Sequence, residues 1–141
     1  QALKHILRCD NAEFRGLTPP EKIADAAHEV DVWILPLLSD RLPGGPLNSH
    51  KILEYLSTGK AVVMNWLEAY DGNPLVHAVS TANGGSLADV LDCVLADLQS
   101  ANAPELMARR RQFALQRTYD RQLEHILDMA NMNDPRRRDA S

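Results

Sequence analysis

Apolar residues follow one another along this chain in short runs that are separated by longer, periodic stretches. Val30–Leu38 is a nearly continuous apolar run, and Lys60–Asn65 is a second, shorter one. Such runs are typical of strands that are covered on both faces, as in parallel sheets. Asn11–Gly16 is a third predicted strand, and a weaker strand pattern lies at Leu75–Val79. Together these runs predict a sheet of parallel strands.

Helical patterns lie between the predicted strands. Thr18 is a candidate cap and Pro19 suits the first helical position, so we expect a helix that continues to about Glu29. From Ser86 to Leu98, apolar residues recur at spacings of three and four, which predicts one amphipathic helix. Further helices are predicted at Ala2–Cys9 and at Ser49–Thr58, the second ending at Gly59. A final pair of helices is predicted to begin at Pro104, with the break between them near Arg117–Tyr119. This alternation predicts an α/β fold, a Rossmann-like parallel sheet flanked by helices.

The domain organisation is simple. The 141 residues fit one domain, which we expect to span residues 1–132, with a polar, arginine-rich tail at residues 133–141. Only three strands are strongly marked, and the sequence does not open with Met. We therefore expect an N-terminally truncated domain that lacks its opening strands and leaves an apolar sheet edge exposed.

Composition narrows the classes of partner. A formal net charge of −4 provides no overall field to attract nucleic acid, and no apolar run approaches the roughly 20 residues that span a bilayer. Cys9 and Cys93 lie outside any CxxC pattern, which indicates a reduced, cytoplasmic chain with two small buried side chains. Five scattered histidines lack metal-ligand spacing, so no metal site is predicted.

A group of arginines is interpreted as a solvated helix face. Its members are Arg109–Arg111, Arg117 and Arg121. Peripheral association with the inner face of the membrane is the alternative that this group leaves open.

The candidate chemistry lies where the first predicted strand leads into a helix. Ligands of parallel α/β sheets sit on such loops, and free N–H groups at a helix start bind anions. The side chains that can donate hydrogen bonds there are Asn48, Ser49, His50 and Lys51. Glu54, one turn beyond Lys51, could accept hydrogen bonds from two sugar hydroxyls. Anion donors beside a diol acceptor predict a site for a nucleoside diphosphate. The alternative is that Asn48 or Ser49 only caps the helix, and that Lys51 and Glu54 form a solvated ion pair.

The same segments resemble a known family. VDVWILPLL, followed by PLNSHKILEYLSTGKAVV, is similar to the central motif of the C-terminal domain of GT-B glycosyltransferases. NAEFRGLTPPEKIADAAHEVD upstream and RRRQFALQRTYDRQLEHIL downstream resemble the flanking units of that domain. The resemblance covers about residues 11–130 in the family's order. It implies an incomplete C-terminal half of a GT-B fold.

The resemblance also implies roles for individual residues. Glu54 matches the glutamate that binds the donor ribose, and Lys51 matches a residue that contacts the donor diphosphate or sugar. The other donor-binding positions that it implies are Asn48 and Ser49 at the loop–helix junction, Gly44 and Gly45 in the glycine-containing loop, and Gly16, Leu17 and Thr18 in the turn beside the nucleobase. Many retaining members carry a second glutamate where this chain has Pro46, so the stereochemistry stays open. No catalytic residue is assigned.

The expected function follows from this resemblance. It implies a glycosyltransferase domain that binds a nucleotide-diphospho-sugar, a UDP- or GDP-sugar, for transfer to an acceptor held by an N-terminal domain of the same protein. No metal or other cofactor is expected. A nucleotide-sugar epimerase of the same fold, and a non-catalytic nucleotide-binding or interaction module, are the alternatives. The sequence contains no GxSxG, GxxxxGK or HExxH motif, so the common hydrolase, P-loop and zincin classes have no support.

Overall fold

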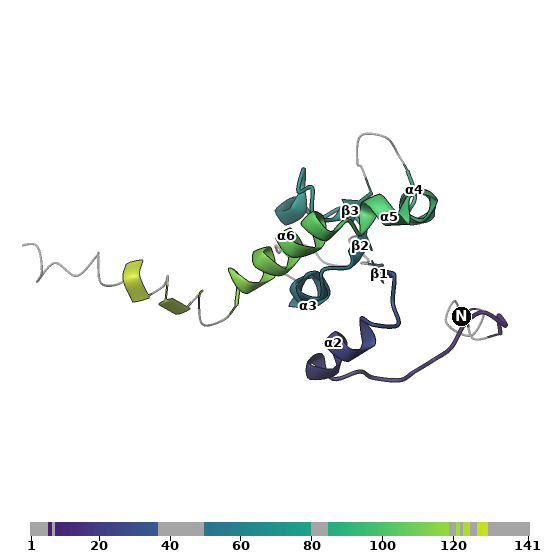
Figure 1. The fold of residues 1–141 in the computed structure, drawn as a ribbon, viewed down its shortest axis with the longest axis horizontal. Coiled ribbons are helices and arrows are strands. Elements are labelled where there is room, and N and C mark those ends of the chain that lie inside the picture. Colours follow the sequence, from purple (N-terminus) through teal and green to yellow (C-terminus); the bar gives the residue numbers. More distant parts are fainter. Residues whose placement is uncertain are drawn as a thin grey trace, which may run out of the picture.

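A three-stranded parallel sheet organises the chain, with its strands in the order β1-β2-β3 (Figure 1). The computed structural model describes residues 6, 8–36, 50–79, 85–118, 121, 123–124 and 127–129. The strands are β1 (Val32–Leu35), β2 (Ala61–Met64) and β3 (His77–Ala78). The helices are η1 (Pro20–Lys22), α2 (Ile23–Ala26), α3 (His50–Thr58), η3 (Glu68–Tyr70), α4 (Leu87–Ala96), α5 (Leu98–Ala101) and α6 (Pro104–Leu115). The prediction of an α/β fold with a parallel sheet flanked by helices is confirmed.

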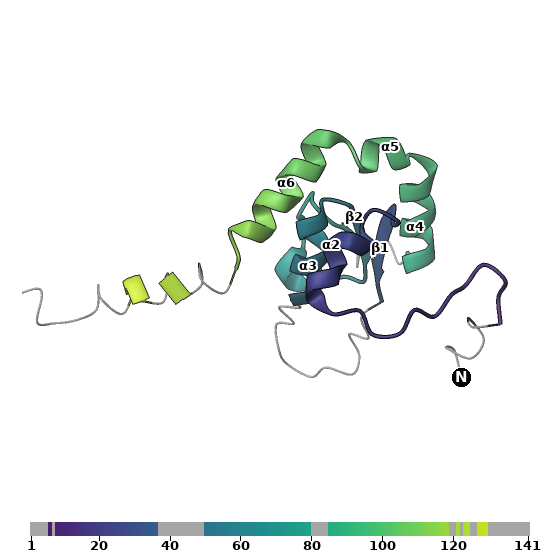
Figure 2. The same ribbon diagram turned by 60° about the horizontal axis from the view of Figure 1, so that its bottom comes forward.

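Strand β2 is the centre of the molecule, and all four of its residues are fully buried. Because side chains alternate across a strand, its residues divide between two faces. Val62 and Met64 join the core cluster that contains Ile52 of α3, whereas Ala61 and Val63 join the cluster that contains Val94 of α4. The sheet therefore lies between α3 with α6 on one face and α4 on the other (Figure 2).

Several predicted boundaries are confirmed, and each has a local cause. Gly59 ends α3 with a positive φ of 85°, a conformation that glycine adopts without strain. Ser86 caps α4 in a capping box, in which its side chain accepts from the N–H of Asp89 and the Asp89 carboxylate accepts from the N–H of Ser86. Pro104 occupies the start of α6. The weak strand predicted within Leu75–Val79 is present as β3.

The region before β1 differs from the prediction. Asn11–Gly16 forms no strand, because a strand needs a partner and Phe14 is 67% exposed with no sheet beside it. Thr18 does not cap a helix: Pro19 is the N-cap residue and provides no side-chain bond. A residue before proline is kept out of the α region, so Pro19 stays extended and the helix begins only at Pro20. The helix that was predicted to reach Glu29 is reduced to η1 and the short α2.

Two further elements are shorter than predicted. The helix expected from Ser86 to Leu98 is interrupted at Asp97, whose backbone leaves the helical region before α5 begins. Strand β1 covers only part of Val30–Leu38. It forms one edge of the described sheet, and Ile34 is 43% exposed there, which agrees with the expected exposed apolar edge.

Two predictions about single residue types are wrong. Cys9 and Cys93 are exposed rather than buried. Arg110, expected on a solvated face, is fully buried. Its Nε donates to the carbonyl of Leu75, and its Nη1 donates to the carbonyls of Gly59 and Ala101. These acceptors satisfy the guanidinium, which explains why a charged side chain is stable there.

Candidate functional site

Helix α3 carries the predicted site and is held firmly against the sheet. Ile52 and Leu56 are fully buried on its inner side, and α6 packs along it. Trp33 of β1 stacks on Tyr55 with ring centroids 4.4 Å apart, and its Nε1 donates to Thr58 Oγ1 at 3.0 Å. Trp33 is therefore a packing residue. These contacts fix which side chains of α3 face outward.

A cleft of about 270 Å³ lies between α3 and the C-terminal end of α6. His50, Leu53, Glu54 and Ser57 line it from α3, at positions that share one helix face. The α6 side and the residues after it contribute Ala114, Leu115, Arg117 and Thr118. The cleft thus combines one carboxylate with hydroxyl, imidazole and guanidinium groups.

Glu54 is the acidic group of this cleft, and it is already paired. Lys51 Nζ donates to Glu54 Oε2 at 2.7 Å, and the Glu54 side chain is 25% exposed. This hydrogen bond to Glu54 raises the pKa of Lys51. One carboxylate oxygen is therefore bound to the ammonium group, while the side chain keeps a partly open position in the cleft.

Arg117 enters the cleft from the end of α6. Its guanidinium carbon lies 3.6 Å from the ring centroid of Phe113, and its Nη1 donates to the Phe113 carbonyl at 3.4 Å. A cation stacked on an aromatic face is oriented as well as attracted. The sequence identified Arg117 only as part of a solvated helix face, and it did not single out Thr118 for this site. The packing of α6 against α3 brings Arg117 and Thr118 to the cleft that Glu54 lines. No local sequence pattern predicts this packing.

The other predicted donor-binding residues are not all brought to this cleft. Gly16, Leu17 and Thr18 are exposed, on the extended segment that leads into η1 (Figure 1). Leu17 is fully exposed, and no described hydrogen bond or ion pair joins these three residues to α3. Asn48, Ser49, Gly44 and Gly45 lie outside the described residues, so their predicted roles stay predictions.

Two other kinds of feature are absent from the described residues. No group of three or more His, Cys, Asp or Glu residues is placed to hold a metal ion within the part of the chain that the structure describes. Of the described helices, none has the length and apolar character needed to cross a bilayer.

Comparison with known proteins adds no family to this description. A scan against protein-family models, a search of curated proteins and a search of solved structures each found no match.

Proposed function

We propose that this chain binds the nucleotide part of a nucleotide-diphospho-sugar, as the donor domain of a GT-B glycosyltransferase. The observation that carries the proposal is the position of Glu54, in a cleft on the helix that follows β1. A carboxylate can accept hydrogen bonds from the two neighbouring hydroxyls of a ribose. The acceptor substrate would be held by an N-terminal domain of the same protein, and no metal is required.

The charges around Glu54 suit the rest of such a ligand. Arg117 lines the same cleft, and Lys51 lies on the same helix as Glu54. A guanidinium and an ammonium are the usual partners of phosphate oxygens. The volume of about 270 Å³ is slightly below the roughly 300–1,000 Å³ of typical ligand pockets. It therefore matches the ribose and one phosphate rather than the whole donor.

A reduced compartment also fits the proposal, and we propose a cytoplasmic location. Cys9 and Cys93 form no disulfide with each other and are exposed. Exposed thiols persist in the cytosol, where disulfides are rare.

One observation favours a second candidate, a non-catalytic interaction module. Lys51 already satisfies one oxygen of Glu54, so the pair could exist without any ligand. In that case Lys51 and Glu54 are surface charges of a helix. Such pairs contribute only about 0.3–0.5 kcal/mol to stability.

The decisive test is the variant Glu54→Gln, with UDP and GDP titrated separately and followed by NMR of the ¹⁵N-labelled chain. Two charge-assisted hydrogen bonds of about 1.5–3 kcal/mol each are weakened, so nucleotide affinity should fall by about tenfold or more. Glu105→Gln is the matched control, because Glu105 is exposed in the first turn of α6, at the opposite end from Arg117. It should bind like the wild type.

Lys51→Met separates the two candidate functions. If the chain binds nucleotide diphosphates, this variant loses affinity because a phosphate partner is removed. If the pair is only structural, Glu54→Gln and Lys51→Met both leave the titration unchanged. The absence of UDP- or GDP-induced shifts at α3 and Arg117 in the wild type would reject the donor-binding proposal outright.

A further inference from the structure

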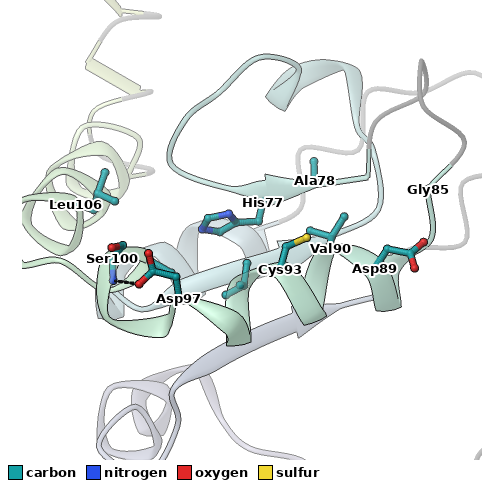
Figure 3. Close-up of a pocket in the computed structure, with 11 residues that line it drawn as sticks. His77, Ala78, Gly85, Asp89, Val90, Cys93, Asp97, Ser100 and Leu106 are labelled. Atoms are coloured by element: carbon teal, nitrogen blue, oxygen red, sulfur yellow. Dashed lines mark hydrogen bonds between the residues drawn. The ribbon is translucent and has the colours of Figure 1, made fainter.

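A second cleft, larger than the first, lies on the other face of the sheet. Its volume is about 500 Å³, and it is bounded by β3, α4, α5 and the start of α6 (Figure 3). His77 of β3 pairs in register with Val63, whose side chain belongs to the α4 cluster. Because partners in a parallel pair point to the same face, His77 projects toward α4 and away from α3. The two clefts are therefore separated by the sheet.

The floor of this second cleft is apolar. Val90 and Val94 of α4, Ala101 of α5 and Leu106 of α6 line it. Its volume falls within the roughly 300–1,000 Å³ of small-molecule sites, which combine apolar walls with a few placed polar groups. Here the polar groups are the imidazole of His77, the carboxylates of Asp89 and Asp97, and the hydroxyl of Ser100.

His77 is neutral, and its Nε2 faces the guanidinium of a buried arginine. Its Nε2 lies 3.5 Å from Nη2 of the buried Arg110. A guanidinium has only donors, so this contact requires an unprotonated Nε2 and leaves the hydrogen on Nδ1. Burial, and then the charge of Arg110, lower the pKa of His77. The histidine therefore contributes no positive charge to the cleft at neutral pH.

Asp97 and Asp89 supply negative charge to the same cleft. Asp97, at the junction of α4 and α5, accepts from the N–H of Ser100 at 3.1 Å, and hydrogen bonds from the Ser100 side chain and backbone lower its pKa. The N–H of Ser86, and then its hydroxyl, lower the pKa of Asp89. Among the described residues, neither carboxylate forms an ion pair with a lysine or an arginine. Both are ionised at neutral pH.

We propose that this second cleft binds a compact apolar molecule that carries a primary amine. The ammonium group meets the carboxylate of Asp97, which caps α5 through Oδ1, and the apolar body lies over Val94 and Leu106. The charge complementarity identifies the ligand class. Two carboxylates would repel the diphosphate proposed for the α3 cleft, so the two sites take different ligands.

Benzylamine is a suitable probe, because it combines one ammonium group with a small apolar ring. We expect it to shift the amide NMR signals of His77, Val94 and Asp97, with saturation in the millimolar range. Benzyl alcohol, which is close in shape but uncharged, should bind about tenfold more weakly, as expected for the loss of a charge-assisted hydrogen bond. Equal affinity for the two probes would overturn the role of the carboxylates.

The matched variants are Asp97→Asn and Asp92→Asn. Asparagine caps helices as well as aspartate does, so Asp97→Asn keeps α5 while removing the charge. It should reduce benzylamine affinity about tenfold, to that of benzyl alcohol. Asp92 is exposed on α4 and does not line the cleft, so Asp92→Asn should bind benzylamine like the wild type.

A third variant tests the location without altering any charge. Cys93 is exposed and lines the cleft, so Cys93→Trp fills the space while leaving the core intact. It should abolish the benzylamine shifts. Unchanged binding in either Asp97→Asn or Cys93→Trp, or a wild type that shows no shift at the lining residues, would refute the proposed site.

Discussion

At the scale of single residues, Arg110 holds three parts of the chain together. Its guanidinium reaches the carbonyl at the end of α3 (Gly59), the carbonyl at the end of α5 (Ala101) and the segment that leads into β3 (Leu75). The carbonyl ends of helices carry partial negative charge, so a buried cation is favourable at this point. Arg110 is also the group that orients His77.

Replacing Arg110 by methionine should destabilise the fold strongly. Each buried carbonyl that loses its donor costs about 1–3 kcal/mol, so we expect Arg110→Met to lower the free energy of unfolding by about 3 kcal/mol or more. Arg109→Met is the matched control, because Arg109 is the exposed neighbour on the same helix, and it should change stability by less than about 0.5 kcal/mol. Urea denaturation measures both. Equal midpoints for the two variants would contradict the role of Arg110.

At the scale of elements, the end of α3 is determined both by a local residue and by a residue of α6. Locally, Gly59 takes the left-handed conformation that terminates the helix. From a distance, Arg111 of α6 donates through Nε and Nη2 to the Thr58 carbonyl and fills the space beside Gly59. A Cβ on Gly59 would lie 3.0 Å from Arg111 Nε. The helix that carries Glu54 is therefore closed by a residue far away in the sequence.

Gly59→Ala tests this closure, with Gly72→Ala as its control. Both glycines have positive φ, so alanine should cost each about 1–2 kcal/mol of backbone strain. Only Gly59 has atoms within 4 Å of the added Cβ, so Gly59→Ala should be clearly the more destabilising of the two. Thermal unfolding of both variants gives the comparison. If they lose the same stability, Arg111 does not constrain the end of α3.

At the scale of the whole molecule, apolar burial is concentrated around β2 and fades toward the C-terminal side. Met64 is fully buried between β-sheet neighbours and the α3 face, whereas Leu115, Leu123 and Leu127 are more than half exposed. Stability therefore depends on the central layers. The two clefts lie on opposite sides of those layers, so a ligand in one does not contact a ligand in the other.

Substitution of one buried and one exposed methionine tests this distribution of apolar burial. Removing a buried methionine side chain typically costs about 2–5 kcal/mol, so Met64→Ala should destabilise the chain by that amount. Met129 is 41% exposed, and Met129→Ala should change stability by less than about 0.5 kcal/mol. Urea denaturation distinguishes them. A large effect at Met129 would show that the C-terminal residues belong to the core.

Much of the fold could be predicted from the sequence because its causes are local. The apolar runs of β1 and β2, the glycine that ends α3, the cap of α4 at Ser86 and the proline at the start of α6 all act within a few residues. The Lys51–Glu54 contact was also accessible, because two residues three positions apart on a helix are neighbours.

Tertiary structure decided what depends on distant partners. Asn11–Gly16 has a strand-like sequence but no neighbouring strand, so it stays extended and exposed. The arginines near residue 110 look alike in sequence, yet the packing of α6 buries Arg110, stacks Arg117 on Phe113 beside Glu54 and leaves Arg109 in solvent. The second cleft is built from four elements, and only their packing brings His77, Asp89 and Asp97 to one place. Periodicity and turn chemistry specify elements, whereas burial and charge neighbourhoods arise only when those elements pack.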